Sequence, residues 1–234
     1  MTYRLILCLF LSSGIVMQST MAAVITPLND KAKALYKEGL ALKKSGNLEG
    51  ALECFIGAIK RNSGFAGAYL EAARIHAQLE NYQESIYYYQ ADLKIDSLQA
   101  TAWYELGMIC FNTQDFGAAL RAFEKAGSQG IATDATFHFN IGVTCLQLQQ
   151  IARGIKHLQA AQALHPADTQ ITHSLAHAYF RQGKYAAAIE QWNKVVQLEP
   201  QNAFAWFMLG KSYIEIGERE KGYALCDKAT ANSY

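Results

Sequence analysis

Two histidines one helical turn apart are the first candidates for chemistry in this chain. His173 and His177 have the four-residue spacing at which two imidazoles on a helix can share a metal ion. A stable site needs a third ligand, and the residues 34 positions before and after the pair offer no neutral one. These residues are Phe139, Val143, Phe207 and Lys211. The sequence therefore predicts no metal site, and nothing else in it indicates a cofactor.

The remaining sequence shows no arrangement of catalytic residues. It contains no Gly-rich phosphate loop, no nucleophile elbow and no pair of carboxylates at a catalytic spacing. Its 21 basic and 20 acidic side chains nearly cancel, and no basic stripe is present that could neutralise a phosphate backbone. We therefore expect neither an enzyme nor a nucleic-acid-binding protein.

The N-terminus has the pattern of a secretory signal peptide over residues 1–22. Arg4 precedes an apolar run of 13 residues from Leu5 to Met17, and Thr20 and Ala22 are small residues in the −3 and −1 places of a cleavage site. The run is shorter than the roughly 20 residues that span a bilayer. We expect an exported protein, periplasmic in the first instance. Secretion and an uncleaved leader that anchors the chain in the membrane are the alternatives.

Four cysteines follow this leader, and their places argue against disulfides. Cys110 and Cys145 lie 35 residues apart at equivalent points of a repeated pattern described below, and both fall among apolar residues. Equivalent points in neighbouring helical units are separated by roughly 8–10 Å. This separation exceeds the roughly 7 Å between Cα atoms that a disulfide permits. We expect free thiols in the core.

The elements that position these residues follow from a repeat. A small residue recurs at intervals of 34, 34, 35, 34 and 34, at Gly39, Ala73, Gly107, Gly142, Ala176 and Gly210. A constant period of this length indicates one supersecondary unit stacked on copies of itself. With the small residue as position 8, six repeats cover residues 32–65, 66–99, 100–134, 135–168, 169–202 and 203–234, after a short segment at 23–31.

Each repeat carries two apolar stripes with helical periodicity. Positions 4, 7, 8 and 11 form the first stripe, as in Trp103, Leu106, Gly107 and Cys110, and positions 20, 24 and 27 form the second. A turn between them falls at position 15, which is Gly in the first, fifth and sixth repeats. Pro166 and Pro200, at position 32, mark the end of a repeat. The unit is therefore a helical hairpin.

This pattern resembles the tetratricopeptide repeat (TPR) family over residues 32–234. The resemblance implies an all-α, right-handed superhelical solenoid of six helix–turn–helix repeats that binds other proteins in a concave groove. Some repeats depart from the pattern. Glu80, Gln114 and Gln149 stand where the turn glycine is usual, and the third repeat has one extra residue near residues 127–130. We expect local looseness at these points.

The first helix of each repeat, called helix A, has a second face at positions 2, 5, 9, 12 and 13. In TPR proteins this face lines the groove, and here it is rich in aromatic residues, Met and hydrogen-bonding side chains. The alternative for positions 5 and 12 is that they pack against the adjacent helix A. The predicted binding residues are Tyr104, Met108, Phe111, Asn112, Phe139, Val143, Gln147, His173, His177, Phe180, Phe207 and Lys211.

These features predict a non-catalytic scaffold that holds a peptide or helix segment of another exported or envelope protein. By analogy with periplasmic TPR proteins, the role lies in outer-membrane or pilus assembly. Contact with a membrane is expected only through partners or an uncleaved leader. Two other functions fit the sequence. One is self-association into a homo-oligomer through an uncapped C-terminal repeat, and the other is an accessory arm of a secreted or periplasmic enzyme complex.

Overall fold

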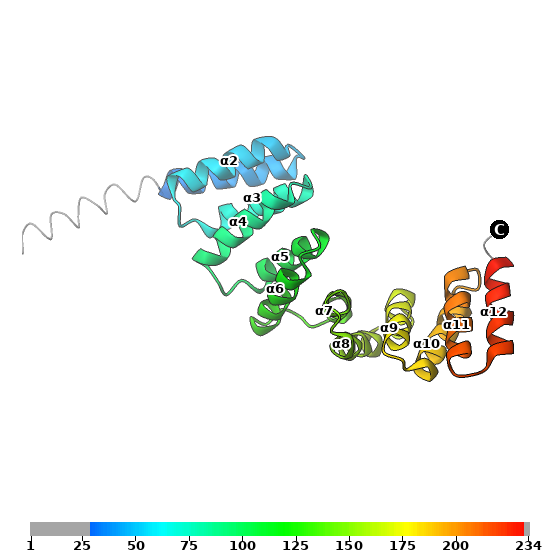
Figure 1. Cartoon of the computed structure of the whole chain (residues 1–234). Coiled ribbons are helices and arrows are strands. Elements are labelled where there is room, and N and C mark those ends of the chain that lie inside the picture. The colour runs from blue at the N-terminus through cyan, green and yellow to red at the C-terminus, as the bar shows by residue number, and fades with distance from the viewer. Residues whose placement is uncertain (1–28, 232–234) are drawn as a thin grey trace, which may run out of the picture. The chain divides into compact units, whose positions relative to one another are not determined.

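The computed structural model describes residues 29–231, and every regular element in that range is a helix (Figure 1). The described part of the first helix spans residues 29–44. The others are α2 (Leu48–Arg61), α3 (Ala66–Gln78), α4 (Tyr82–Ile95), α5 (Ala100–Asn112), α6 (Phe116–Ser128), α7 (Ala135–Gln147), α8 (Ile151–Leu164), α9 (Thr169–Arg181), α10 (Tyr185–Leu198), α11 (Ala203–Glu215) and α12 (Arg219–Ala231). The protein is an all-α helical repeat solenoid. The expected signal peptide lies outside the described residues.

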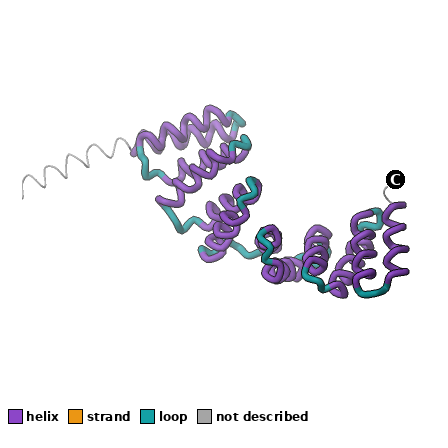
Figure 2. Tube along the Cα trace, in the orientation of Figure 1, coloured by secondary structure: helices purple, strands orange, loops and turns teal. Residues whose placement is uncertain are grey.

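The chain forms two compact units that divide between Ala102 and Trp103. The first unit contains α2, α3 and α4 together with the helix that precedes them. The second contains most of α5 and all of α6 to α12. In both, helices alternate with short loops (Figure 2). None of the described helices is long and apolar enough to cross a membrane.

Small residues at position 8 allow the two helices of a hairpin to approach each other closely. A Cβ atom at Gly107 would lie 2.6 Å from Cδ1 of Phe123, and one at Gly142 would lie 2.8 Å from Cγ of Leu158. Real Cβ atoms do not approach other atoms so closely, because two carbon atoms at this distance repel each other strongly. The period that reveals the repeat in the sequence therefore marks the contact between helix A and its partner, helix B.

All six turns between helix A and helix B reach the left-handed region at position 15. Gly46, Gly183 and Gly217 have φ values of 85°, 76° and 92°. The three residues that replace glycine adopt the same conformation, with φ values of 59°, 63° and 60° at Glu80, Gln114 and Gln149. The turn thus keeps its geometry where looseness was expected. The extra residue of the third repeat falls in the loop after α6, where Gly130 has a φ of 87°.

Several helices begin at a side-chain cap. The carboxylate of Asp115 accepts a hydrogen bond from the backbone N–H of Ala118, and Asp134 and Asp168 do the same for Phe137 and Ile171. Such caps satisfy N–H groups that the first helical turn leaves without partners. They fix the points at which α6, α7 and α9 start.

The core contains most of the expected positions and two more, but position 4 is an exception: Trp103 and Trp206 are only partly buried. Phe55, Phe123 and Trp192, all at position 24, are fully buried. Positions 3 and 10 of helix A, which the apolar stripe did not include, are also buried, because a hairpin stacked on neighbours is covered over a wider arc than one stripe. The residues at these two positions that are buried are Ala68, Ile75, Ala102, Ile109, Phe137, Thr144, Ile171, Ala178, Ala205 and Ser212.

The four cysteines of the described chain are free thiols. Cys110 and Cys145 are buried, as their places in the repeat predict, while Cys54 and Cys226 are partly exposed. Burial raises the pKa of the Cys110 thiol to about 11, so this thiol stays protonated and unreactive at neutral pH.

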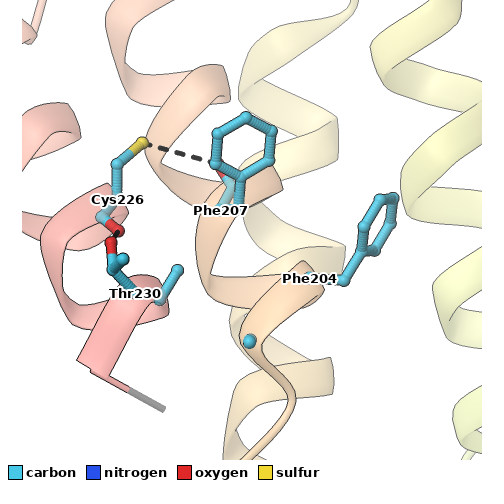
Figure 3. Close-up of a pocket in the computed structure, with 6 residues that line it drawn as sticks. Phe204, Phe207, Cys226 and Thr230 are labelled. Atoms are coloured by element: carbon cyan, nitrogen blue, oxygen red, sulfur yellow. Dashed lines mark hydrogen bonds between the residues drawn. The ribbon is translucent and has the colours of Figure 1, made fainter. Parts of the chain in front are cut away.

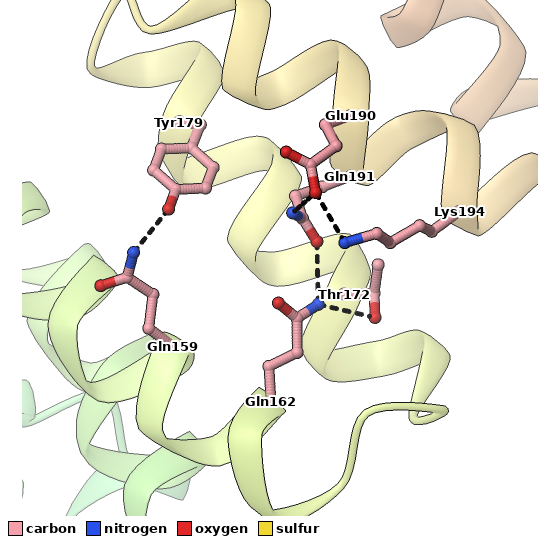
Figure 4. Close-up of polar contacts among 7 residues, drawn as sticks. All are labelled: Gln159, Gln162, Thr172, Tyr179, Glu190, Gln191 and Lys194. Carbon is pink, nitrogen blue, oxygen red and sulfur yellow. Dashed lines mark hydrogen bonds and ion pairs between the residues drawn. The ribbon is translucent and has the colours of Figure 1, made fainter.

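A polar network joins the fourth and fifth repeats (Figure 4). The Gln162 amide donates to the Thr172 hydroxyl at 3.3 Å and to the Gln191 carbonyl oxygen at 2.8 Å. Thr172 and Gln191 are both buried, so these bonds satisfy groups that would otherwise lose their water. The network holds α8, α9 and α10 in register.

Candidate functional site

The predicted binding residues lie on α5, α7, α9 and α11, all within the second unit. We call the surface formed by positions 2, 5, 9, 12 and 13 of these four helices the A-helix face. Contacts divide its residues into two groups, those that join neighbouring helices and those that line pockets.

Position 5 joins the third, fourth and fifth hairpins to the next helix A. The Tyr104 ring lies 5.5 Å from that of Phe123 in its own hairpin and 6.3 Å from that of Phe137 in α7. Its hydroxyl accepts a hydrogen bond from the Asn140 amide at 2.7 Å, and the same amide contacts Sδ of Met108 at 3.2 Å. Burial raises the pKa of the Tyr104 phenol, while the Asn140 bond lowers it. Tyr104 therefore holds α5 against α7.

The same arrangement recurs in the fourth and fifth repeats. Phe139 packs against a buried cluster that contains Ala161 of α8 and Ile171 of α9. The His173 ring stands edge-on to that of Trp192 at 4.9 Å and lies 5.5 Å from that of Phe204 in α11. Position 5 thus contributes to packing between repeats, which is the alternative that the sequence left open.

Position 12 fastens helix A to the start of helix B in its own hairpin. Phe111 meets Phe116 edge-on at 5.4 Å, and Phe180 meets Tyr185 at 5.3 Å. Asn112, in contrast, is exposed at the end of α5. The aromatic rings at position 12 are only partly covered, so they belong both to the hairpin and to the surface.

Four of the predicted residues come together in one pocket of about 240 Å³. Val143 and Gln147 from α7 lie opposite His173 and His177 from α9. The pocket is completed by Leu146, Ser174, Arg181 and Phe204. We call this the central pocket. It lies across α7, α9 and α11.

Arg181 is the one permanently charged residue of the central pocket. Its Nη2 donates to the carbonyl oxygen of Leu146 at 3.3 Å and to Oε1 of Gln149 at 2.6 Å, and both acceptors are neutral. Burial lowers the pKa of His177, and the positive charge of Arg181 and the neighbouring imidazole of His173 lower it further. Burial also lowers the pKa of His173, against an opposing effect of Glu199. Both shifts favour the neutral imidazole. Among the described residues, no carboxylate pairs with Arg181.

A second pocket of about 300 Å³ lies between α11 and α12 (Figure 3). Phe204 and Phe207 line it from one side, Cys226 and Thr230 from the other. Phe204 is 49% exposed and Phe207 is 44% exposed. The exposed Lys211 lies with its Nζ 5.6 Å from the centre of the Phe207 ring. Phe204 also lines the central pocket, so the two pockets adjoin along α11.

Sequence reasoning missed the role of position 6 of helix A. Asn140 reaches back to Tyr104 and Met108 of the preceding repeat, and Ser174 lines the central pocket. In the first unit Glu71 also reaches back, pairing with Lys43 at 2.6 Å. A polar residue at the same position of several repeats was the available signal, because such a residue beside an apolar stripe needs a partner.

Comparisons with known proteins identify the class. Tetratricopeptide repeat models match residues 36–99 and 100–126, and a TPR repeat model matches residues 176–217. Together these matches cover more than half of the chain. With the repeated helical hairpins described above, they show that the chain is a tetratricopeptide repeat protein.

Similar proteins share the repeat at low identity. Superkiller protein 3 of Schizosaccharomyces pombe is 22% identical over 198 residues, which are 81% of this chain and 14% of that protein. The chain spans between 6 and 40% of the length of the curated relatives compared. MamA from Desulfovibrio magneticus RS-1 has a similar structure, with a TM-score of 0.65 at 22% identity, over 74% of this chain and 97% of MamA.

The structure of YrrB is described as that of a TPR protein with an unusual peptide-binding site. It superposes with a TM-score of 0.69 at 26% identity, and the match covers 77% of this chain and 93% of YrrB.

Proposed function

We propose that this chain is a scaffold that binds a peptide or helix segment of another protein on the A-helix face. The observation that carries the proposal is the pair of adjoining pockets along α11, flanked by two phenylalanines that remain about half exposed. Exposed aromatic residues beside a pocket are the side chains that contribute most to protein interfaces. The peptide-binding site named for YrrB supports the same class of ligand.

The partner that we propose is an exported or envelope protein, with the chain itself in the periplasm. The support is the signal-peptide pattern of residues 1–22, which lies outside the described structure. A place in outer-membrane or pilus assembly is the narrower form of this proposal and rests on analogy with exported TPR proteins.

A selection of random peptides displayed on phage, with the purified chain as bait, tests the proposal. Wild-type protein should enrich peptides, and Phe207→Ala should weaken their binding by about 2 kcal/mol or more. Because Phe207 is half exposed, the same change should cost less than about 1 kcal/mol of folding free energy. Tyr223→Ala is the matched control, since Tyr223 is 58% exposed but lies on α12 outside the A-helix face.

Phe139→Ala separates binding from packing on the same face. Phe139 contacts two buried clusters, so its loss should lower the thermal stability more than Phe207→Ala does. Failure of the wild-type chain to enrich any peptide, or equal binding by Phe207→Ala and wild type, would contradict the proposed function.

A further inference from the structure

The size of the central pocket indicates what enters it. Its volume is about 240 Å³. Pockets for small molecules and cofactors usually hold about 300–1,000 Å³. The central pocket therefore fits one side chain of a larger partner better than a complete small molecule.

The lining of the pocket combines apolar side chains with one guanidinium, that of Arg181. Val143, Leu146 and Phe204 supply the apolar surface, and no carboxylate belongs to the lining. Glu199 acts on His173 from outside the pocket lining and accepts a hydrogen bond from Asn202 at 2.7 Å.

Arg181 is placed to receive an anion. A guanidinium has five N–H donors in a fixed fork, and both of the Arg181 contacts use Nη2. The donors of Nε and Nη1 are left for a ligand, and the two existing bonds hold the group in place beforehand. Its charge faces neutral acceptors, so a carboxylate that approached would meet a positive charge that no carboxylate of the pocket lining neutralises.

We infer that the central pocket takes an apolar side chain from a partner segment that carries an aspartate or glutamate close by, paired with Arg181. This inference rests on the proposed function and specifies its ligand. The carboxylate belongs to a side chain and not to a chain end, because the A-helix face continues on both sides of the pocket. Met108 of α5 lies before it and Lys211 of α11 lies beyond it, so a bound segment can cross the pocket.

The test begins with the sequences of the peptides that the wild-type chain enriches. We expect an excess of Asp or Glu within a few residues of a large apolar residue. The best peptide is then made with a blocked C-terminus in two forms, with Glu or with Gln at the acidic position. Fluorescence anisotropy at low salt measures both against wild type, Arg181→Gln, Arg181→Lys and Lys184→Gln. Lys184 is an exposed cation outside the pocket and serves as the matched control.

The Glu-to-Gln change in the peptide should weaken binding to wild type and to Lys184→Gln by at least about tenfold, as expected for a charge-assisted hydrogen bond between the carboxylate and the guanidinium. With Arg181→Gln the two peptides should bind within about twofold of each other, because the pair is already lost. Arg181→Lys keeps the charge without the planar guanidinium. Its ratio of affinities for the Glu and Gln peptides should lie between those of wild type and Arg181→Gln. Thermal melting of each variant verifies that the protein is folded.

Three results would overturn the inference while leaving the proposed function intact. The enriched peptides could lack an acidic excess, the Glu-to-Gln effect could be equal in wild type and Arg181→Gln, or peptides with a free C-terminal carboxylate and no internal acid could bind best. An absence of enriched peptides would overturn the inference and the proposed function together.

Discussion

At the scale of single residues, the turns of this protein tolerate strain where they lack glycine. Glu80, Gln114 and Gln149 adopt a left-handed backbone that glycine supplies at the same position elsewhere. A side chain in this region costs roughly 1–2 kcal/mol. The surrounding hairpin nevertheless keeps the turn, because the helices on both sides are fixed by close contact at position 8.

Gln114→Gly should therefore stabilise the protein. Relief of the left-handed strain outweighs the extra entropy of glycine in the unfolded chain, so we expect a gain of about 0.5–1 kcal/mol in the free energy of unfolding. Urea denaturation of wild type and variant measures the difference. Gln129→Gly is the matched control. Its φ is −94°, so glycine brings no relief there and should lower the stability by about 0.5–1 kcal/mol.

The residues of the candidate site were only partly predictable, and position 5 shows why. The sequence placed Tyr104 and His173 on the outer side of helix A, and both are partly exposed. Their rings also reach Phe123 and Trp192 of the paired helix, however, because long side chains cover surface beyond their own turn. Angular position around a helix does not contain this information. The charge on Arg181 was visible in the sequence, but the neutrality of its partners was not.

At the scale of elements, the close contact in the hairpin of the third repeat depends on the absence of a methyl group at Gly107. The ring of Phe123 occupies the space in which a Cβ atom of Gly107 would lie. This contact explains why the recurring small residue was sufficient to predict the helix pairs from the sequence. The sequence was less informative on which further positions become buried, because positions 3 and 10 are covered only after neighbouring repeats stack.

The same substitution should have opposite effects at two glycines of one hairpin. Gly107→Ala should lower the free energy of unfolding by about 1–2 kcal/mol, since the clash with the fully buried Phe123 exceeds the gain in helix propensity. Gly117→Ala, in the first turn of α6, places its methyl 3.5 Å from Nη1 of the exposed Arg121 and should stabilise by about 0.5 kcal/mol. Thermal melts compare the two. Equal signs would contradict this account of position 8.

At the scale of the whole molecule, the second unit is stabilised by contacts between neighbours in the sequence. The contacts described above join each hairpin to the next one. In such an array, stability is approximately a sum of hairpin and nearest-neighbour terms, and opening can be local. This is also the reason that the fold class was predictable, since the same pattern of small and apolar residues recurs in every repeat. The residues of the ligand surface differ from repeat to repeat, so no recurring pattern predicts them.

Hydrogen exchange should show this locality directly. Phe123→Ala removes a fully buried ring at a cost of about 3–5 kcal/mol. Amide exchange should accelerate in α5, α6 and α7 and change little in α11 and α12. Each hairpin contacts only its neighbours, so the lost stability at Phe123 does not reach the last hairpin directly. Trp192→Ala, at the same position two repeats later, should accelerate exchange in α9, α10 and α11 and spare α5. If both variants instead accelerated exchange uniformly over residues 103–231, the second unit would unfold as one cooperative body. In that case binding at the central pocket would stabilise every helix of the unit equally, whereas local opening confines the effect of a bound segment to α7, α9, α11 and the helices paired with them.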